Sequence, residues 1–141
     1  MKRGLQTNYP LLNMVIMMMV VLFLWSCGDG QKQAQQAKLK EVQESTCMQL
    51  NDLKKDIEKR IAYLDTQIET AKGELQENLK EVRAELKMQQ EIIEKEMELV
   101  RASSLETWDS VLSDVRKKYQ DARTKTNEVS KKVREWLENG D

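Results

Sequence analysis

Histidine is absent from the 141-residue chain, and aromatic residues make up only 5% of it, with a single phenylalanine. Histidine is the side chain that most often transfers protons near neutral pH, and neither a glycine-rich phosphate loop nor a paired-cysteine metal motif takes its place. We therefore expect no enzymatic activity, no cofactor and no metal site. So few large rings also argue against a wide globular core.

An excess of charge of either sign is missing as well. Lysine and arginine total 23 against 24 for aspartate and glutamate, which gives a formal net charge of −1. Bulk positive charge is what draws proteins to nucleic acid, so we expect no nucleic-acid partner. Charged residues nevertheless make up 33% of the chain, which is typical of long solvated helices.

The N-terminal segment has the layout of an export signal. Lys2 and Arg3 precede an apolar run of 15 positions, from Leu11 to Trp25, that only Asn13 interrupts. A membrane-spanning helix usually needs about 20 apolar residues. The shorter run therefore favours the hydrophobic part of a secretory signal.

The run ends in Leu24-Trp25-Ser26-Cys27, which resembles the lipobox of bacterial lipoproteins. Leu24, Ser26 and Cys27 match its aliphatic, small and cysteine positions, whereas Trp25 stands where a small residue is usual. The resemblance implies that the Cys27 thiol is diacylglycerylated and that the signal is cleaved before this residue. Acyl chains at Cys27 would anchor the protein stably to a membrane.

Two other interpretations of Cys27 stay open: an incidental cysteine near the end of an uncleaved anchor, or a thiol behind a conventional signal peptide. With the lipoprotein interpretation, the chain divides into a signal peptide (1–26), a polar tether (27–36) and a helical region (37–138). The helical region contains no proline and is rich in glutamate, lysine, glutamine and leucine, all strong helix formers. The predicted fold class is all-α.

Apolar residues in the helical region recur every three or four positions, which places them in one narrow stripe along a helix. The first part of the stripe contains Leu50, Leu53, Ile57, Ile61, Leu64, Ile68, Ala71, Leu75, Leu79, Val82, Leu86, Ile93, Met97 and Val100, with polar Gln89 between them. The second part contains Leu105, Trp108, Leu112, Val115, Tyr119, Ala122, Thr126, Val129, Val133 and Trp136. One helix alone does not bury such a stripe, so we predict a coiled coil, formed with another copy or with the same chain folded back.

Two positions favour a turn in this region. Gly73 fits a helix C-cap, and Ser103 with Glu106 matches a capping box before a new helix. A break near residues 101–104 predicts a helical hairpin, and an unbroken helix predicts a rod. We expect a bent, mostly continuous rod that self-associates.

Cys47 and three aromatic residues are the remaining candidate sites. With Cys27 acylated, Cys47 is the one other cysteine in an oxidising compartment, so an intermolecular disulfide is a candidate there, although a small, partly buried side chain is the favoured interpretation. Trp108, Tyr119 and Trp136 form either a partner-binding face or part of the core. Residues 74–98 carry eight acidic and four basic residues, an excess that favours a solvated face over a binding site.

Three functions are compatible with these features. The first is a structural or adaptor lipoprotein of a bacterial envelope, lipid-anchored, with its coiled coil in the periplasm or outside the cell. The second keeps residues 11–25 as a retained anchor, a layout similar to the inner-membrane subunit of a phage spanin. The third is a lipid-tethered binding module or inhibitor. We expect the first, with an envelope protein as partner.

Overall fold

The computed structural model describes the backbone of residues 10–139 and the side chains of residues 30–139. Three helices follow one another, α1 (Pro10–Thr70), α2 (Glu74–Ala102) and α3 (Trp108–Asn139), and residues 10–139 contain no strand. The prediction of an all-α fold is therefore confirmed. The chain divides into two compact units, Met1–Lys38 and Leu39–Asp141, and the second unit holds the packed helices.

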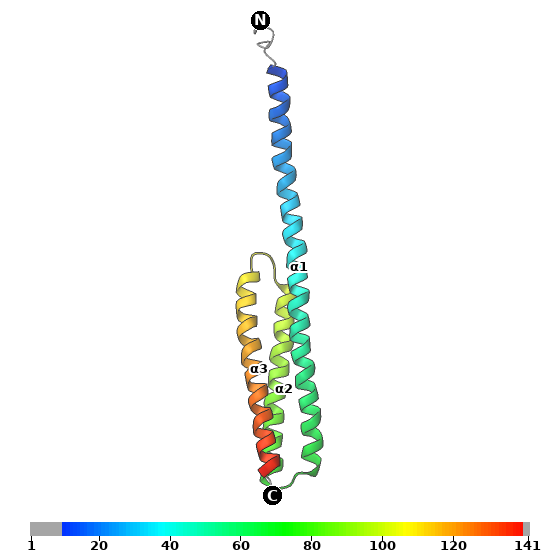
Figure 1. The fold of residues 1–141 in the computed structure, drawn as a ribbon, viewed down its shortest axis with the longest axis vertical. Helices are drawn as coiled ribbons and strands as arrows, with labels where there is room; N and C mark the ends of the chain where they lie inside the picture. The colour runs from blue at the N-terminus through cyan, green and yellow to red at the C-terminus, as the bar shows by residue number, and fades with distance from the viewer. Residues whose placement is uncertain (1–9, 140–141) are drawn as a thin grey trace. The chain divides into compact units, whose positions relative to one another are not determined.

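Within Leu39–Asp141 the three helices lie side by side and alternate in direction (Figure 1). Lys54 of α1 pairs with Glu94 of α2 at 3.0 Å, and Gln43 donates to the carbonyl of Ser103, at the end of α2, at 2.9 Å. As α1 advances, its partners on α2 come earlier in the sequence, so these helices are antiparallel. The unit is a three-helix bundle.

The structure differs from the expected rod, because the chain reverses direction twice. The first reversal follows α1, where Gly73 has a φ of 67°, in the left-handed region that disfavours residues with a Cβ. The Gly73 carbonyl then accepts from the Glu77 amide at 3.3 Å and starts α2. Gln76 reaches back to donate to the Ile68 carbonyl at 3.0 Å. This bond satisfies one of the carbonyls that the end of α1 leaves without a helical partner.

The second reversal lies at residues 103–107, next to the break considered at 101–104. Ser103 ends α2, and its hydroxyl donates to the Val100 carbonyl at 2.6 Å. The expected capping pair of Ser103 and Glu106 is replaced by a neighbouring one. The Ser104 amide donates to the Thr107 hydroxyl at 2.9 Å, and the Thr107 amide donates to the Ser104 hydroxyl at 3.4 Å. The helix therefore begins at Trp108, later than the capping box predicts.

The predicted stripe forms the core of the bundle. Its members on α1 and α2 are all buried or half-buried, including Leu50, Ile57, Leu79 and Leu86. On α3 the buried members are Val115, Ala122, Thr126, Val129 and Val133. Leu105 lies outside the core, with 39% of its surface exposed, because it precedes the start of α3.

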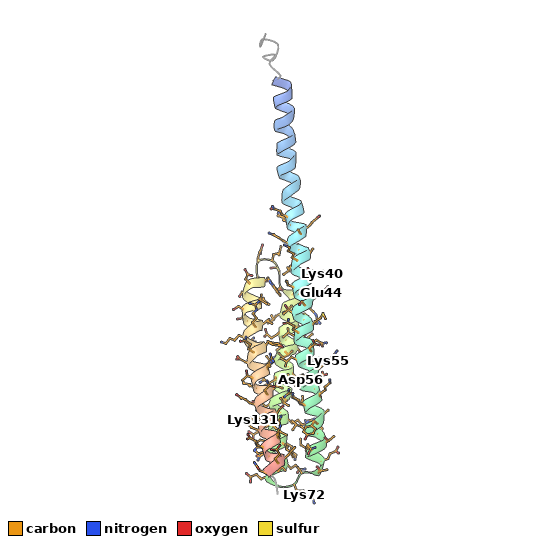
Figure 2. The ribbon with its side chains drawn as sticks, in the orientation of Figure 1. Lys40, Glu44, Lys55, Asp56, Lys72 and Lys131 are labelled. Carbon is orange, nitrogen blue, oxygen red and sulfur yellow. The ribbon has the colours of Figure 1, made fainter. Side chains whose placement is uncertain are left out.

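Charged side chains cover the outside of the bundle, as Lys55 and Lys131 illustrate (Figure 2). The apolar stripes of the three helices pack against one another within a single chain. The bundle therefore buries internally the apolar surface that was predicted to form a coiled coil. Burial of each leucine or isoleucine side chain contributes about 1.5–3 kcal/mol. The stripe by itself therefore no longer requires a second copy.

Gly73→Ala should lower the free energy of unfolding by about 1–3 kcal/mol, the usual cost of holding a residue with a Cβ in this backbone region. No atom lies within 4 Å of the position of the added Cβ, so the cost is conformational and not steric. Lys72→Ala, at an exposed neighbouring position, should change stability by less than about 0.5 kcal/mol. Urea unfolding of the full chain, followed by circular dichroism, measures both. Equal stability of the two variants would contradict the glycine requirement.

Candidate functional site

The surface between α1 and α3 is hollowed along its length. A cavity of about 410 Å³ lies between Leu50 of α1 and Trp108 and Tyr119 of α3. Cavities of about 370 and 520 Å³ follow towards the end of α3, the last one between Leu64 and Val133. We call this series of cavities the α1–α3 groove. Its lining is mostly apolar in the last cavity, mixed in the first and mostly polar in the middle one, and this combination makes it the candidate interaction site of the bundle.

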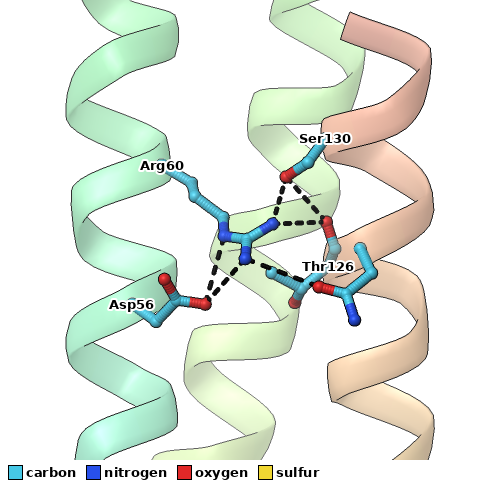
Figure 3. Close-up of polar contacts among 5 residues, drawn as sticks. Asp56, Arg60, Thr126 and Ser130 are labelled. Atoms are coloured by element: carbon cyan, nitrogen blue, oxygen red, sulfur yellow. Dashed lines mark hydrogen bonds and ion pairs between the residues drawn. The ribbon is translucent and has the colours of Figure 1, made fainter. Parts of the chain in front are cut away.

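Arg60 crosses the middle of the groove and ties α1 to α3 (Figure 3). Its guanidinium donates to the Thr126 carbonyl at 3.3 Å, to the Asn127 side chain at 3.4 Å and to the Ser130 hydroxyl. On its own helix it pairs with Asp56 at 3.0 Å, one turn earlier. The planar fork of arginine suits this role, since lysine does not present donors to several acceptors in one plane.

An ion pair between Lys118 of α3 and Glu96 of α2 bridges these two helices, and its glutamate is buried. Glu96 is 1% exposed, and its Oε1 accepts from Lys118 Nζ at 2.7 Å. This hydrogen bond, together with the charge of Glu96, raises the pKa of Lys118 above its ordinary value. Glu96 Oε2 has no hydrogen-bond partner among the described residues. The carboxylate therefore depends on Lys118 for its compensation.

The seam between α1 and α2 carries several polar bridges. Lys54 pairs with Glu94, and this hydrogen bond raises the pKa of Lys54 although partial burial opposes the shift. Gln90 donates to Glu58 at 3.0 Å, and Arg83 pairs with Asp65. Polar bridges thus span both seams of α2. A cavity of about 200 Å³ also lies between α2 and α3, beside Glu96 and Lys118, and the larger cavities lie along the α1–α3 seam.

The residues predicted as sites from the sequence fall in different places. The side chain of Cys27, the predicted lipidation site, lies outside the described residues, as do the side chains of the apolar run 11–25. Cys47 is half-buried against the core, and its Sγ lies 3.9 Å from the Met97 carbonyl, on α2 of the same chain. An intermolecular disulfide at Cys47 stays a prediction.

Trp108, Tyr119 and Trp136 are half-buried and pack against the core. Trp108 and Tyr119 also line the α1–α3 groove, so they combine core packing with an accessible surface. Of the acidic residues expected on a solvated face of residues 74–98, Glu77, Glu81, Glu91, Glu94 and Glu98 are exposed and Glu85 is half-buried.

Arg60, Glu96 and Lys118 were not predicted as site residues from the sequence. Glu96 carries a signal that was available, because it lies seven residues after Gln89 and so repeats a polar residue at the same position of the stripe. Arg60 and Lys118 carry no such signal. Nothing in their local pattern separates them from other charged residues beside the stripe.

Within the described part of the chain, no three histidine, cysteine, aspartate or glutamate side chains gather as metal ligands. Nor does any helix there combine the length and apolar character needed to cross a membrane. Comparison with protein-family models, curated proteins and solved structures finds no match for this chain.

Arg60→Gln should lower the free energy of unfolding by about 1–2 kcal/mol, because the α1–α3 seam loses a charged donor that several oxygens share. Lys59→Gln, which lies beside it without such contacts among residues 30–139, should change stability by less than about 0.5 kcal/mol. A double-mutant cycle with Ser130→Ala measures the coupling directly, and we expect at least about 0.5 kcal/mol. Additive effects of the two substitutions would show that the contact does not stabilise the bundle.

The stability of the bundle should fall at alkaline pH through Lys118. The folded state holds the lysine proton more tightly than the unfolded chain, so this contribution is complete below the ordinary pKa of 10.5. It is lost as the pH rises through the raised value. The stability difference between wild type and Lys118→Met should therefore shrink above pH 10.5. Urea unfolding of both proteins between pH 7 and 12 measures this difference, and a difference that does not change with pH would contradict the assignment.

Proposed function

We propose that this chain is a lipid-anchored protein of a bacterial envelope, whose helical bundle serves as a structural or adaptor module. The observation that carries the proposal is the sequence Leu24-Trp25-Ser26-Cys27 at the end of an apolar run that follows Lys2 and Arg3. The basic start, the 15-position apolar run and the cysteine occur in the order that a lipoprotein signal requires.

The form of the bundle supports an interaction role. Its core is a stack of small and medium aliphatic side chains on three helices, which leaves its surface to charged residues and to the α1–α3 groove. The groove combines aliphatic floor residues, such as Leu64 and Val133, with aromatic and arginine side chains at its edges. Aromatic and arginine residues are enriched where proteins bind one another.

Lipid anchoring is tested by the intact mass of the full chain purified from a bacterial membrane fraction. Wild type should begin at Cys27 and carry acyl chains, because modification and cleavage both depend on this thiol. Cys27→Ala should be neither cleaved nor acylated. Cys47→Ala is the matched control, since it removes the other cysteine and should leave processing and acylation unchanged.

Two results would contradict the proposal. An unprocessed wild type without lipid would make the N-terminal segment a retained anchor, which favours the spanin-like function. A wild type cleaved elsewhere and without lipid would favour a conventional signal peptide. In either case the envelope location would need a basis other than the lipobox.

A further inference from the structure

The rim of the α1–α3 groove is basic. Arg116 and Arg123 line its first cavity, and Lys59 and Arg134 line the last one. None of these four side chains forms an ion pair with a carboxylate of residues 30–139. Three acidic residues also line the groove, Asp52, Asp56 and Glu138, and Asp56 already pairs with Arg60. The groove therefore offers uncompensated positive charge around an apolar floor.

The outer side of α2 has the complementary character. Met88 and Leu99 are 58% and 49% exposed, and their separation of 11 residues, about three helical turns, returns them to the same side of the helix. Glu81 and Glu91, seven residues before Met88 and three after it, flank this apolar surface and are exposed. Lys95 also lies on this side of the helix and forms no ion pair within residues 30–139. Glu81 and Glu91 together outweigh its charge, so this surface keeps a net negative charge.

Neither Glu81 nor Glu91 forms an ion pair with any described basic residue, in contrast to Glu77 and Glu94, which pair with Lys80 and Lys54. We call the surface formed by Glu81, Met88, Glu91 and Leu99 the outer face of α2. It pairs exposed apolar side chains with unpaired negative charge. The α1–α3 groove pairs an apolar lining with unpaired positive charge.

We propose that the outer face of α2 docks into the α1–α3 groove of a second copy of this chain. In a three-helix bundle the outer side of one helix lies opposite the seam between the other two, so the two surfaces do not overlap. A contact between different surfaces is head-to-tail, and it leaves one free groove and one free α2 at the ends of any assembly that does not close on itself. The copies would therefore form a row or a closed ring.

The groove favours a helix over an acyl chain as its occupant. Arg60 and its partners Asp56 and Asn127 form a polar bridge across the middle of the groove, between apolar cavities on both sides. An acyl chain lying along the groove would bring methylene groups against this bridge. A helix instead alternates apolar and polar side chains along its length and can place a carboxylate there.

The inference deepens the proposed structural or adaptor role, since it names a second copy as the partner. It also differs from the coiled coil expected from the sequence, because the stripe stays in the core of each copy. The contact uses rim charges, so association should weaken as ionic strength rises.

Charge reversal tests the pairing in the full chain, by sedimentation in a density-matched neutral detergent. Wild type should associate reversibly, and Arg116→Glu/Arg123→Glu should weaken association at least about tenfold. Glu81→Arg/Glu91→Arg should do the same from the opposite surface. The quadruple variant combines both changes and restores opposite charges across the contact, so it should associate again.

The control is Lys40→Glu/Lys55→Glu, which makes the same change in net charge at exposed positions of α1 that do not line the groove. It should associate as wild type does. A loss of association in the groove variant but not in this control would then be due to the groove charges, and not to the change in net charge or to the N-terminal segment, which both variants keep. Circular dichroism confirms that each variant keeps its helices.

Three outcomes would overturn the inference: a monomeric wild type, association that both double variants leave unchanged, or a folded quadruple variant that stays monomeric. Binding of the groove to anionic phosphatidylglycerol vesicles, lost in Arg116→Glu/Arg123→Glu while the wild type remains monomeric, would replace the second copy with a lipid surface. None of these results depends on whether Cys27 is cleaved and acylated. If the docking inference fails, the proposed lipid anchor is still decided by the intact-mass measurement.

Discussion

Everything in this bundle depends on the width of the apolar stripe. Each helix presents a single row of aliphatic side chains, and such a row is covered only when another helix lies against it. One continuous helix without a partner would leave the row in water along its whole length. In this chain two reversals supply the covering helices, and they bring Leu50 and Ile57, Leu79 and Leu86, and Val129 into one core. The turns permit this arrangement, and burial of the stripe drives it.

Aliphatic side chains of similar size do not fix how the helices align, because one leucine packs much like another. Polar groups at the seams add that information. Glu96 is buried and compensated by Lys118 alone among the described residues, so a shift of α3 by one turn would leave a carboxylate buried without its partner. A buried ion pair adds little net stability, but its loss is costly, and this asymmetry favours one register.

The three seams of the bundle are not closed equally. Ion pairs and side-chain hydrogen bonds hold α2 to both neighbours, whereas α1 and α3 are bridged mainly at Arg60. Cavities remain on either side of this bridge. The cavities of about 370–520 Å³ lie along the α1–α3 seam, whereas the cavity between α2 and α3 is about 200 Å³. The bundle therefore has its larger groove on one side and the outer face of α2 on the other.

The sequence by itself determined the all-α class and most residues of the core, and it marked Gly73 and Ser103 as positions where the chain could turn, although it favoured a mostly continuous helix. Heptad spacing is a local property, so Leu50, Ile57 and Leu86 could be assigned to the stripe from their separations alone. Gly73 carried a local signal too, because its lack of a Cβ matters at a single backbone position. The site residues Trp108 and Tyr119 were found in the same way, although whether they face a partner or the core was left open.

Only the tertiary structure decided that the chain folds back, and with that it decided the groove. A stripe of given width is satisfied equally well by another copy or by the same chain, so spacing does not choose between them. The contacts of Arg60 with α3 and of Lys118 with Glu96 join residues 66–70 and 22 positions apart. Such pairs form only when the helices are aligned in space. They could not be predicted from the sequence, because a charged residue beside the stripe has the same local pattern whether it faces water or a partner.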